Sequence, residues 1–155
     1  MTEESASNPR DDSITIEPAR SSDLTAILDL LTDSGLPQDG VSDHIASAVV
    51  AKSDKAVVGC AALELYGEAA LLRSVAVAKK FKEQGLGKKL TQEVLNLGKE
   101  KGVSHFYLLT ETAGEYFPKF GFQPIDRSKV PDLVQTSVEF TSACPASALA
   151  MKLSI

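Results

Sequence analysis

The most specific chemistry of this sequence lies where an apolar run meets two glycines. Residues 69–78 are mostly apolar, and after a short mixed stretch comes Gly85-Leu86-Gly87-Lys88-Lys89 at the start of an amphipathic pattern. Glycines at such a junction let a ligand approach the backbone closely, and the first N–H groups of the helix have no partner within it. The positive end of the helix dipole and the lysines add attraction for anions. The segment therefore predicts a site for phosphate or pyrophosphate.

The charge distribution agrees with a compact anionic ligand. The chain has a formal net charge of −5, yet residues 79–89 contain five lysines and one glutamate. An acidic protein with one small basic segment is unlike proteins that bind nucleic acid broadly, because those present a basic face. If the two glycines are not considered, the lysines are explained equally well as an ordinary solvent-exposed basic segment without a ligand.

Size and composition predict one folded domain. The chain has 155 residues, of which 43% are hydrophobic and 24% charged, as in ordinary globular domains. It has no apolar run of the roughly 18–20 residues that a membrane span requires, and its acidic start lacks the apolar stretch of a secretory signal. Cys60 and Cys144 are too few for a disulfide scaffold and show no metal-ligand spacing with the two histidines. We expect a soluble, cytoplasmic protein without a metal or a membrane partner.

Two common phosphate-binding motifs are absent from the glycine turn. The third residue after Gly87 is leucine, so the dinucleotide fingerprint Gly-x-Gly-x-x-Gly is missing, and the Walker A spacing is missing as well. What remains, Lys82-Glu83-Gln84-Gly85-Leu86-Gly87, resembles the acetyl-coenzyme A signature of the GNAT superfamily of N-acetyltransferases, Gln/Arg-x-x-Gly-x-Gly/Ala. Lys82 keeps the positive charge of the first position but lacks the donor fork of arginine. Farther along, Tyr116-Phe117-Pro118-Lys119-Phe120-Gly121-Phe122 resembles a second landmark of the family, an aromatic pair followed by Gly-Phe.

The resemblance covers roughly residues 14–155 and implies the fold and the reaction of the GNAT family. The fold is α/β (α+β), with a mixed, mostly antiparallel sheet that contains a splayed strand pair and is flanked by helices. The co-substrate is acetyl-coenzyme A (acetyl-CoA), whose pantetheine arm pairs with the splayed strand while the glycine turn holds its pyrophosphate. An amine then attacks the acetyl carbonyl directly. Carried over residue by residue, the cofactor-binding positions are Val75, Ala76, Val77, Lys82, Glu83, Gln84, Gly85, Leu86, Gly87 and Lys88.

The resemblance also raises the question of the acid and the base. The family often has a tyrosine acid second in the aromatic pair, but this position is Phe117, which has no proton to donate. Tyr116 is the candidate acid if it turns into the cleft; otherwise it is a packing residue, and the thiolate leaves unassisted or is protonated through water. Glu64 is the candidate base, directly or through water, because a carboxylate in an apolar run is costly unless it faces a cleft or a partner. The alternative is that Glu64 is a solvent-exposed carboxylate on a face of the sheet and has no catalytic role.

Arg73 is the second charge in an apolar strand. Strand alternation predicts that its side chain shares a face with Leu71 and Val75. A planar guanidinium near the cleft would clamp a carboxylate of the acceptor. An internal salt bridge to Glu64 or Glu68 across the hairpin explains the residue equally well, so both interpretations stand.

The last part of the chain adds candidate acceptor-binding residues and a closer resemblance. Ser142 and Ser147 lie in a polar bend before the last strand, where they could bind acceptor oxygens or satisfy the backbone of the loop itself. Residues 66–77 and 140–145 look like a GNAT branch that occurs with arsenic-resistance operons and is related to the acetyltransferase domain of N-acetylglutamate synthases. We expect acetyl transfer to the primary amine of a small, amino-acid-like or xenobiotic molecule. The alternatives are a lysine or N-terminal amine of a protein as acceptor, and a coenzyme A-binding module without chemistry; homodimers are common in the superfamily.

The elements that have to position these residues alternate between strand and helix. Residues 1–13 are polar and are expected to form a tail, so the folded domain spans 14–155. Apolar or alternating runs predict strands at 14–16, 48–51, 56–66, 69–78, 103–110 and 148–153. The strands 56–66 and 69–78 form a hairpin that turns at Gly67-Glu68. Helical spacing and caps predict helices between Ser21 and Gly35, from 86 to just before Gly102, at 112–119, and from Pro131 onward.

Overall fold

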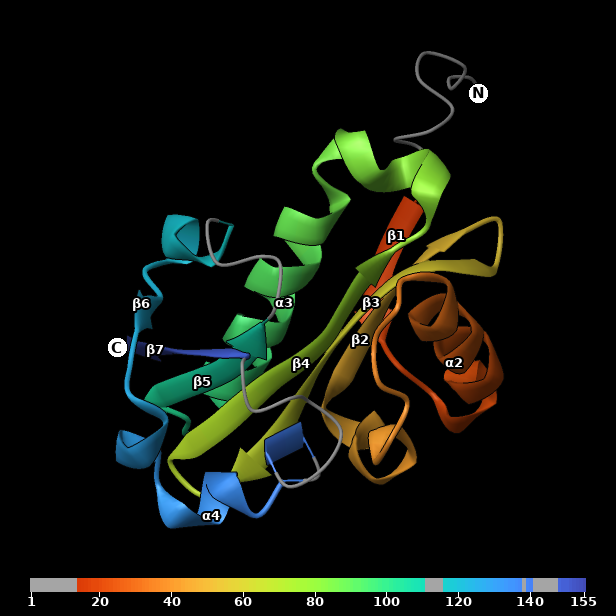
Figure 1. The fold of residues 1–155 in the computed structure, drawn as a ribbon. Helices are drawn as coiled ribbons and strands as arrows, with labels where there is room; N and C mark the ends of the chain where they lie inside the picture. Colours follow the sequence, from red (N-terminus) through yellow and green to blue (C-terminus); the bar gives the residue numbers. More distant parts are fainter. Residues whose placement is uncertain (1–13, 111–115, 138, 141–147) are drawn as a thin grey trace.

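A computed structural model describes residues 14–110, 116–137, 139–140 and 148–155 of the chain, so the predicted tail lies outside it. The described residues form a seven-stranded sheet with the order β1-β2-β3-β4-β5-β7-β6 (Figure 1). Only β4 and β5 run parallel; the other neighbouring strands of this sheet are antiparallel. In chain order the strands are β1 (Ile14–Pro18), β2 (Ala48–Ser53), β3 (Ala56–Tyr66), β4 (Ala69–Val77), β5 (His105–Thr110), β6 (Gln123–Pro124) and β7 (Leu149–Ser154).

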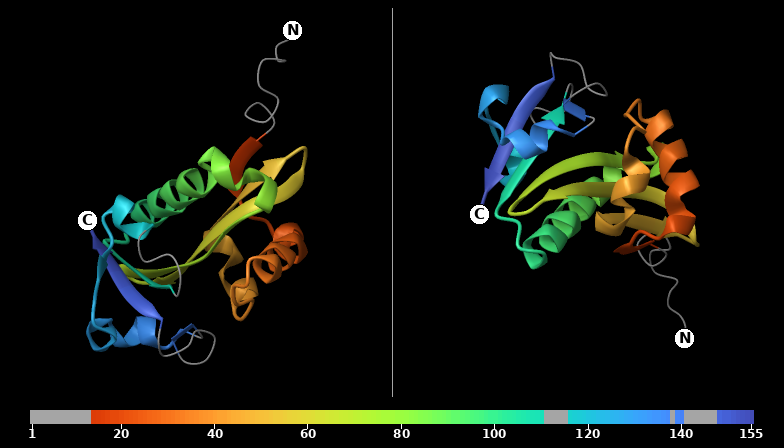
Figure 2. Two further views of the ribbon diagram at one scale, coloured as in Figure 1. Left: turned by 45° about the horizontal axis from the view of Figure 1, so that its top comes forward. Right: turned by 90° about the horizontal axis from the view of Figure 1, so that it is seen from below.

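Helices cover both faces of this sheet (Figure 2). The helix α3 (Leu86–Glu100) packs on one face, with its apolar side chains in the largest core cluster. The helix α2 (Leu24–Asp33) packs on the other face over β2, β3 and β4, and the short α4 (Asp132–Gln135) packs on that same face over β4, β5 and β7. The predicted fold class, a mixed and mostly antiparallel sheet flanked by helices, is confirmed.

The turn before α3 brings the start of that helix against β4. Gly85 has a left-handed backbone with φ of 74°, which ends the preceding 3-10 helix and begins α3. A Cβ built on Gly87, in the first turn of α3, would lie 3.6 Å from Cγ2 of Val77. Leu90 and Val94, four residues apart on the buried side of the helix, are fully buried in the core below β2, β3 and β4. The packing of α3 therefore fixes its N-terminus beside the end of β4.

The parallel pair β4 and β5 is joined over only part of its length. Ala69, Ala70 and Leu71 pair with β5, but β4 continues to Val77 and β5 continues to Thr110 without further pairing between them. The two strands diverge beyond Leu71, as Figure 1 shows. Among the described residues, the backbone groups on that side of β4 have no strand partner beyond Leu71, which leaves an open strand edge inside the sheet. The predicted splayed pair is thus present.

A β-bulge lies in the open part of β4. Ser74 and Val75 stand opposite the single residue Ala61 of β3, and Ser74 has a left-handed φ of 61°. The extra residue reverses the alternation, because Leu71 packs in the layer of α4 whereas Val75 packs against the α3 core. The prediction that Arg73 shares one face with both Leu71 and Val75 is therefore wrong for Val75.

The helical segments differ most from expectation around the aromatic pair. Residues 111–115 lie outside the described part, and the rest of the helix predicted at 112–119 is a 3-10 helix over Phe117–Phe120. Pro118 sits in its first turn, where a missing N–H costs little. Another 3-10 helix, η2 (Ser21–Asp23), begins the segment that was predicted as a helix between Ser21 and Gly35. The sequence did not predict the 3-10 helices η3 (Val41–Ser47), η4 (Lys79–Gln84) and η6 (Arg127–Lys129) or the two-residue strand β6, and η5 is the label of the 3-10 helix Phe117–Phe120.

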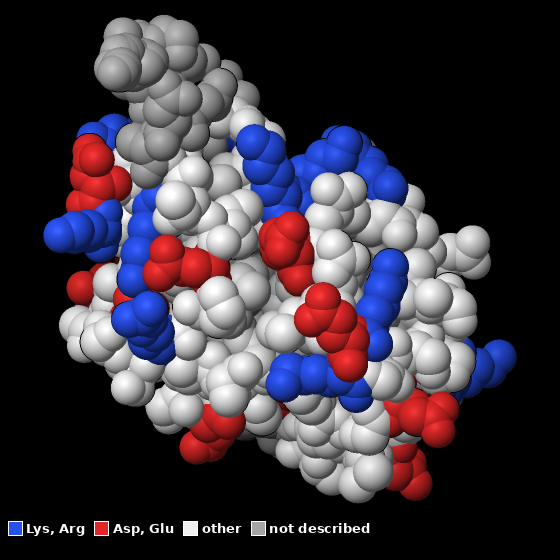
Figure 3. Space-filling model, turned by 180° about the vertical axis from the view of Figure 1, so that it is seen from behind, with Lys and Arg blue, Asp and Glu red and all other residues white. Residues whose placement is uncertain are grey.

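The surface carries charges of both signs. On the side opposite to that of Figure 1, basic and acidic side chains lie interspersed (Figure 3). The five lysines of residues 79–89 are all exposed, as expected for a basic segment around the glycine turn. In the described part of the chain, no helix is both long enough and apolar enough to cross a membrane.

Candidate active site

A cavity of about 870 Å³ follows the open edge of β4. Its walls come from both diverging strands, from the turn after α2 and from the aromatic segment; they include residues 72–77, 108–110 and 34–37 together with Tyr116, Phe117, Lys119 and Phe120. The cavity therefore lies where β4 and β5 diverge. A strand edge with unpaired backbone groups can bind an elongated ligand as an added strand.

One end of the cavity is basic and lined by glycine. Lys82, Gly85, Gly87 and Lys88 contribute to it. A Cβ built on Gly85 would meet no atom within 4 Å, so the backbone of this turn is open to a ligand. At this end the backbone N–H groups of the first turn of α3, which have no partner within the helix, lie near the side chains of Lys82 and Lys88. Both features attract a phosphate group.

The predicted cofactor positions divide into residues that line the cavity and residues that do not. Val75, Ala76 and Val77 line it together with the four residues of the basic end. Leu86 is buried in the core under α3, and Gln84 borders a different, small cavity. Of Glu83, only the backbone, within η4, is described. Four of the predicted residues of the turn therefore reach the cavity, whereas Leu86 packs in the core.

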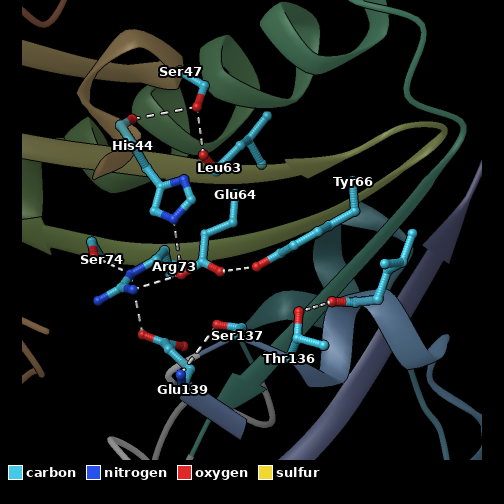
Figure 4. A network of polar contacts seen from close by, with 11 residues as sticks. His44, Ser47, Leu63, Glu64, Tyr66, Arg73, Ser74, Thr136, Ser137 and Glu139 are labelled. Atoms are coloured by element: carbon cyan, nitrogen blue, oxygen red, sulfur yellow. Dashed lines mark hydrogen bonds and ion pairs between the residues drawn. The ribbon is translucent and has the colours of Figure 1, made fainter. Parts of the chain in front are cut away.

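The opposite end of the cavity holds a buried ionic network around Arg73 (Figure 4). Its Nη1 donates a hydrogen bond of 2.6 Å to Oε2 of Glu64, and its Nε lies 3.3 Å from Oε2 of Glu139. The Arg73 side chain is fully buried, and those of Glu64 and Glu139 are nearly so. The Nε also donates to Oγ of Ser74, 3.1 Å away. The internal salt bridge expected for Arg73 is present with Glu64, and a second carboxylate joins it.

Glu64 is held as a charged acceptor. Tyr66 donates its hydroxyl to Oε1 of Glu64 at 2.5 Å, and Nε2 of His44 lies 3.8 Å from Oε2. Burial alone raises the pKa of Glu64, but hydrogen bonds from Tyr66, Ser137 and Arg73 outweigh it, so the pKa lies below its ordinary value. Burial and the neighbouring carboxylate raise the pKa of Tyr66 to about 12, so this hydroxyl keeps its proton. Glu64 does not line the cavity, in contrast to Arg73.

The guanidinium of Arg73 retains one donor group without a partner. Its Nη2 is buried and has no hydrogen-bond partner within the described part of the chain. An unsatisfied buried donor costs about 1–3 kcal/mol, and more when the group is charged. Arg73 also contributes to the cavity wall, so this residue connects the ionic network to the cavity. A carboxylate clamp and an internal salt bridge are therefore compatible in this residue.

Glu139 is a cavity residue that the sequence did not single out. It lies on the short segment between α4 and β7, is 4% exposed and lines the cavity beside Arg73. Its backbone N–H donates to Oγ of Ser137 at 3.1 Å. The only sequence signal was one acidic residue next to Phe140 in a mixed stretch, which does not distinguish it from a surface glutamate. The network also draws on Ser137 and His44, which are far from Arg73 in sequence.

The aromatic segment closes the cavity near the glycine turn. Tyr116 packs edge-on against Phe117 and Phe120, with centroids 5.2 and 5.4 Å away, and its hydroxyl would lie 3.3 Å from a Cβ built on Gly87. Burial raises the pKa of Tyr116, which a hydrogen bond with Thr91 offsets only in part. A protonated phenol thus lines the cavity near the first turn of α3, while the Phe117 ring is buried. The candidate acceptor residues Ser142 and Ser147 lie outside the described part.

The comparison with protein families decides the kinship of this chain. The acetyltransferase (GNAT) domain family matches residues 44–124, just over half of the sequence. The chain belongs to the GNAT acetyltransferase family. The matched region includes the hairpin, the bulge, the glycine turn and the aromatic segment, which together form most of the cavity.

Relatives of this GNAT chain include amino-acid acetyltransferases. An uncharacterised N-acetyltransferase of Chlorobaculum tepidum is 29% identical over 97 residues, which is 62% of each protein. An amino-acid acetyltransferase of Neisseria meningitidis is 25% identical over 128 residues, 77% of this chain but 29% of that enzyme. The chain therefore spans less than two thirds of the length of either relative.

Solved structures agree with the GNAT fold. The N-acetylglutamate synthase of Neisseria gonorrhoeae, complexed with coenzyme A and N-acetylglutamate, superposes with a TM-score of 0.78 at 21% identity and covers 91% of this chain and 35% of that chain. A Mycobacterium tuberculosis protein in complex with CoA and NLQ has a TM-score of 0.77 at 22% identity and covers 91% of this chain and 99% of that chain. The predicted kinship with amino-acid N-acetyltransferases is confirmed, and the link to arsenic-resistance operons stays a prediction.

Proposed function

We propose that this GNAT chain transfers an acetyl group from acetyl-CoA to the primary amine of a small, amino-acid-like molecule. The observation that carries the proposal is one cavity with two different ends, a basic glycine-lined turn at one and the unpartnered Nη2 of Arg73 at the other. A phosphorylated thioester fits the first end, and a molecule with a carboxylate fits the second. Relatives named amino-acid acetyltransferases support this choice of acceptor over a protein amine.

The residues present fit the co-substrate along the whole open edge. The backbone of Val75, Ala76 and Val77 would pair with the pantetheine arm, because in the described part of the chain no strand pairs with that side of β4 beyond Leu71. The pyrophosphate would lie over the turn of residues 82–88, where Gly85 leaves open space. Coenzyme A supplies the activated acyl group, and the chain supplies its orientation. The cavity of about 870 Å³ has room for both reactants.

The roles of the remaining side chains follow from their surroundings. Arg73 would bind the acceptor carboxylate through Nη2 while Glu64 and Glu139 hold its other nitrogens. Tyr116 would protonate the departing thiolate, since its phenol is protonated at neutral pH and lines the cavity. The general-base role of Glu64 stays a prediction; a carboxylate with lowered pKa and three donors is better suited to positioning Arg73.

A thermal-shift titration tests the cofactor site first. A ligand that binds only the folded protein raises its stability, so acetyl-CoA and coenzyme A should each give a saturable rise in melting temperature. Gly85→Glu should remove the shift because it adds bulk and negative charge beside the phosphates. Gly67→Glu is the matched control, since Gly67 has a similar φ of 69°, equally open space and no place in the cavity.

Turnover then tests the reaction. Release of free thiol from acetyl-CoA is measured with a panel of amino acids and with peptides that carry lysine or a free N-terminus. Amino acids should be the better acceptors, and a carboxamide in place of the carboxylate should reduce kcat/KM. Binding of acetyl-CoA without thiol release for any amine would indicate a coenzyme A-binding module, and no binding at millimolar cofactor would refute the proposed function.

A further inference from the structure

One hydroxyl is buried on the apolar side of α3. Thr91 is fully buried there, between Leu90 and the next buried residue, Val94. A buried hydroxyl costs stability unless it is hydrogen-bonded. Thr91 donates its hydroxyl to the backbone carbonyl of Gly87, one turn earlier and 2.8 Å away. That bond uses the only proton of the hydroxyl, so the Thr91 oxygen is left as an acceptor beside the first turn of the helix.

The phenol of Tyr116 is the partner of this acceptor. Its oxygen would lie 3.3 Å from a Cβ built on Gly87, the residue whose carbonyl Thr91 binds. Tyr116 and Thr91 share a hydrogen bond, in which the phenol donates because the Thr91 proton is directed to Gly87. The Tyr116 ring packs edge-on against Phe120, and Nζ of Lys119 lies 5.5 Å from the ring centroid. Contacts with neighbours therefore hold both the ring and its hydroxyl.

Thr91 can act on the reaction only through this phenol. Tyr116 and Gly87 line the cavity, whereas Thr91 does not. We propose that Thr91 is a positioning residue for the acid Tyr116, a role that rests on the proposed acetyl transfer. Thr91 holds the phenol oxygen at the cavity wall and stabilises the phenolate that remains once the proton has left. Phe117, the position at which the family often has its acid, offers no hydroxyl for this purpose.

The proton balance shows when the Thr91 hydroxyl matters. The neutral amine forms a bond to the acetyl carbon, the carbon–sulfur bond breaks, and Tyr116 gives its proton to the sulfur. The Thr91 hydroxyl then turns from the carbonyl of Gly87 to the phenolate. A hydrogen bond to a charged oxygen is roughly twice as strong as a neutral one, so Thr91 favours the state after proton transfer. The nitrogen loses its proton to solvent and the phenolate takes one back, which leaves the N-acetyl compound and the free thiol.

The test uses Thr91→Val in the full chain, because valine replaces the hydroxyl by a methyl group of similar size. With the amino acid that gives the highest turnover in the wild type, kcat should fall about 10-fold, the effect of one hydrogen bond in the transition state. The KM values for acetyl-CoA and for the amino acid should not change. Thr91→Ser keeps the hydroxyl and should restore most of kcat. Val94→Ala is the control, since Val94 is equally buried in α3 and does not line the cavity; it should lower stability but not kcat.

A double-mutant cycle separates positioning from a general effect on the fold. When Tyr116→Phe has already removed the phenol, adding Thr91→Val should leave kcat unchanged, because the hydroxyl no longer has a phenol on which to act. A merely structural role of Thr91 would lower kcat in both backgrounds. Equal losses with and without the phenol therefore overturn the proposal, as does a loss that Thr91→Ser does not restore.

The outcomes for Thr91 and for acetyl transfer are distinguishable. No thiol release by the wild type with any amine contradicts the proposed function, and this inference falls with it. Turnover by the wild type with an unchanged kcat in Thr91→Val contradicts only the role of Thr91. If the Val variant does not fold, Thr91→Ala removes the same hydroxyl without adding bulk, and it has to show the same loss of kcat and the same dependence on Tyr116.

Discussion

Glu64→Gln should show how much of the fold depends on the buried network. Loss of one member of a buried ion pair costs about 3–5 kcal/mol. Glu139 remains 3.3 Å from Nε of Arg73 in this variant, so the guanidinium keeps one carboxylate and the lower end, about 3 kcal/mol, applies. For a chain of this length that corresponds to a fall in melting temperature of about 6–12 °C at pH 7.

The sign of the pH dependence gives a second readout for Glu64→Gln. The pKa of Glu64 lies below its ordinary value of 4.5 in the folded protein. Its stabilisation is therefore fully present above that ordinary value and is lost as the pH falls through the folded-state pKa. The stability curves of the wild type and the variant should converge in acid, where Glu64 of the wild type is neutral as well.

Urea unfolding at several pH values, followed by circular dichroism, is the assay for Glu64→Gln. Glu68→Gln is the control, because Glu68 is an exposed residue on the same hairpin and should stay within about 0.5 kcal/mol of the wild type. If the free energy of unfolding falls by less than about 1 kcal/mol at pH 7, the ion pair contributes no more than an exposed one, and the reasoning is refuted. A larger loss that does not vary with pH would refute its electrostatic origin.

Three further changes test other parts of the structure. Gly98→Ala should destabilise the protein by about 1–3 kcal/mol in urea, because its Cβ would lie 2.7 Å from Cε1 of Phe106 in the core; an unchanged midpoint would contradict the close packing of α3. Tyr116→Phe should lower kcat about 100-fold if the phenol protonates the thiolate, whereas an unchanged kcat means that the thiolate leaves without it. Burial raises the pKa of Cys60 to about 12, so iodoacetamide at pH 8 should alkylate this thiol only in urea. Mass spectrometry of the Cys60 peptide checks this, and equal labelling with and without urea would disprove the burial.

Local patterns in the sequence predicted the elements well. The hairpin at Gly67-Glu68 and the helix after Gly85 follow from turn chemistry and from apolar spacing, which act over a few residues. The strand 148–153 was displaced by only one residue at its ends, as Leu149–Ser154. The 3-10 helix η3 and the two-residue strand β6 were missed, because they are too short for a period to be recognised.

The sequence predicted one part of the candidate site, the glycine turn, but not the bulge in β4. The glycine turn could be predicted from local sequence, because a glycine directly before an amphipathic pattern marks the start of a helix, and Gly85 has the left-handed backbone typical of such a turn. The bulge at Ser74 has no such signal: the residue is not a glycine, and the bulge arises from the pairing of β3 with β4. A strict period of two consequently placed Val75 on the wrong face.

The sequence by itself thus determined most of the longer strands and helices, the glycine turn before α3, and the need for partners of Glu64 and Arg73, two charged residues in apolar strands. Only the tertiary structure decided which groups satisfy them. Glu139 approaches Arg73, 66 positions away in the chain, because α4 packs over β4 and β5 and β7 pairs with β5. Contacts over such separations depend on how whole elements pack, and neither charge nor period in a sequence encodes that distance.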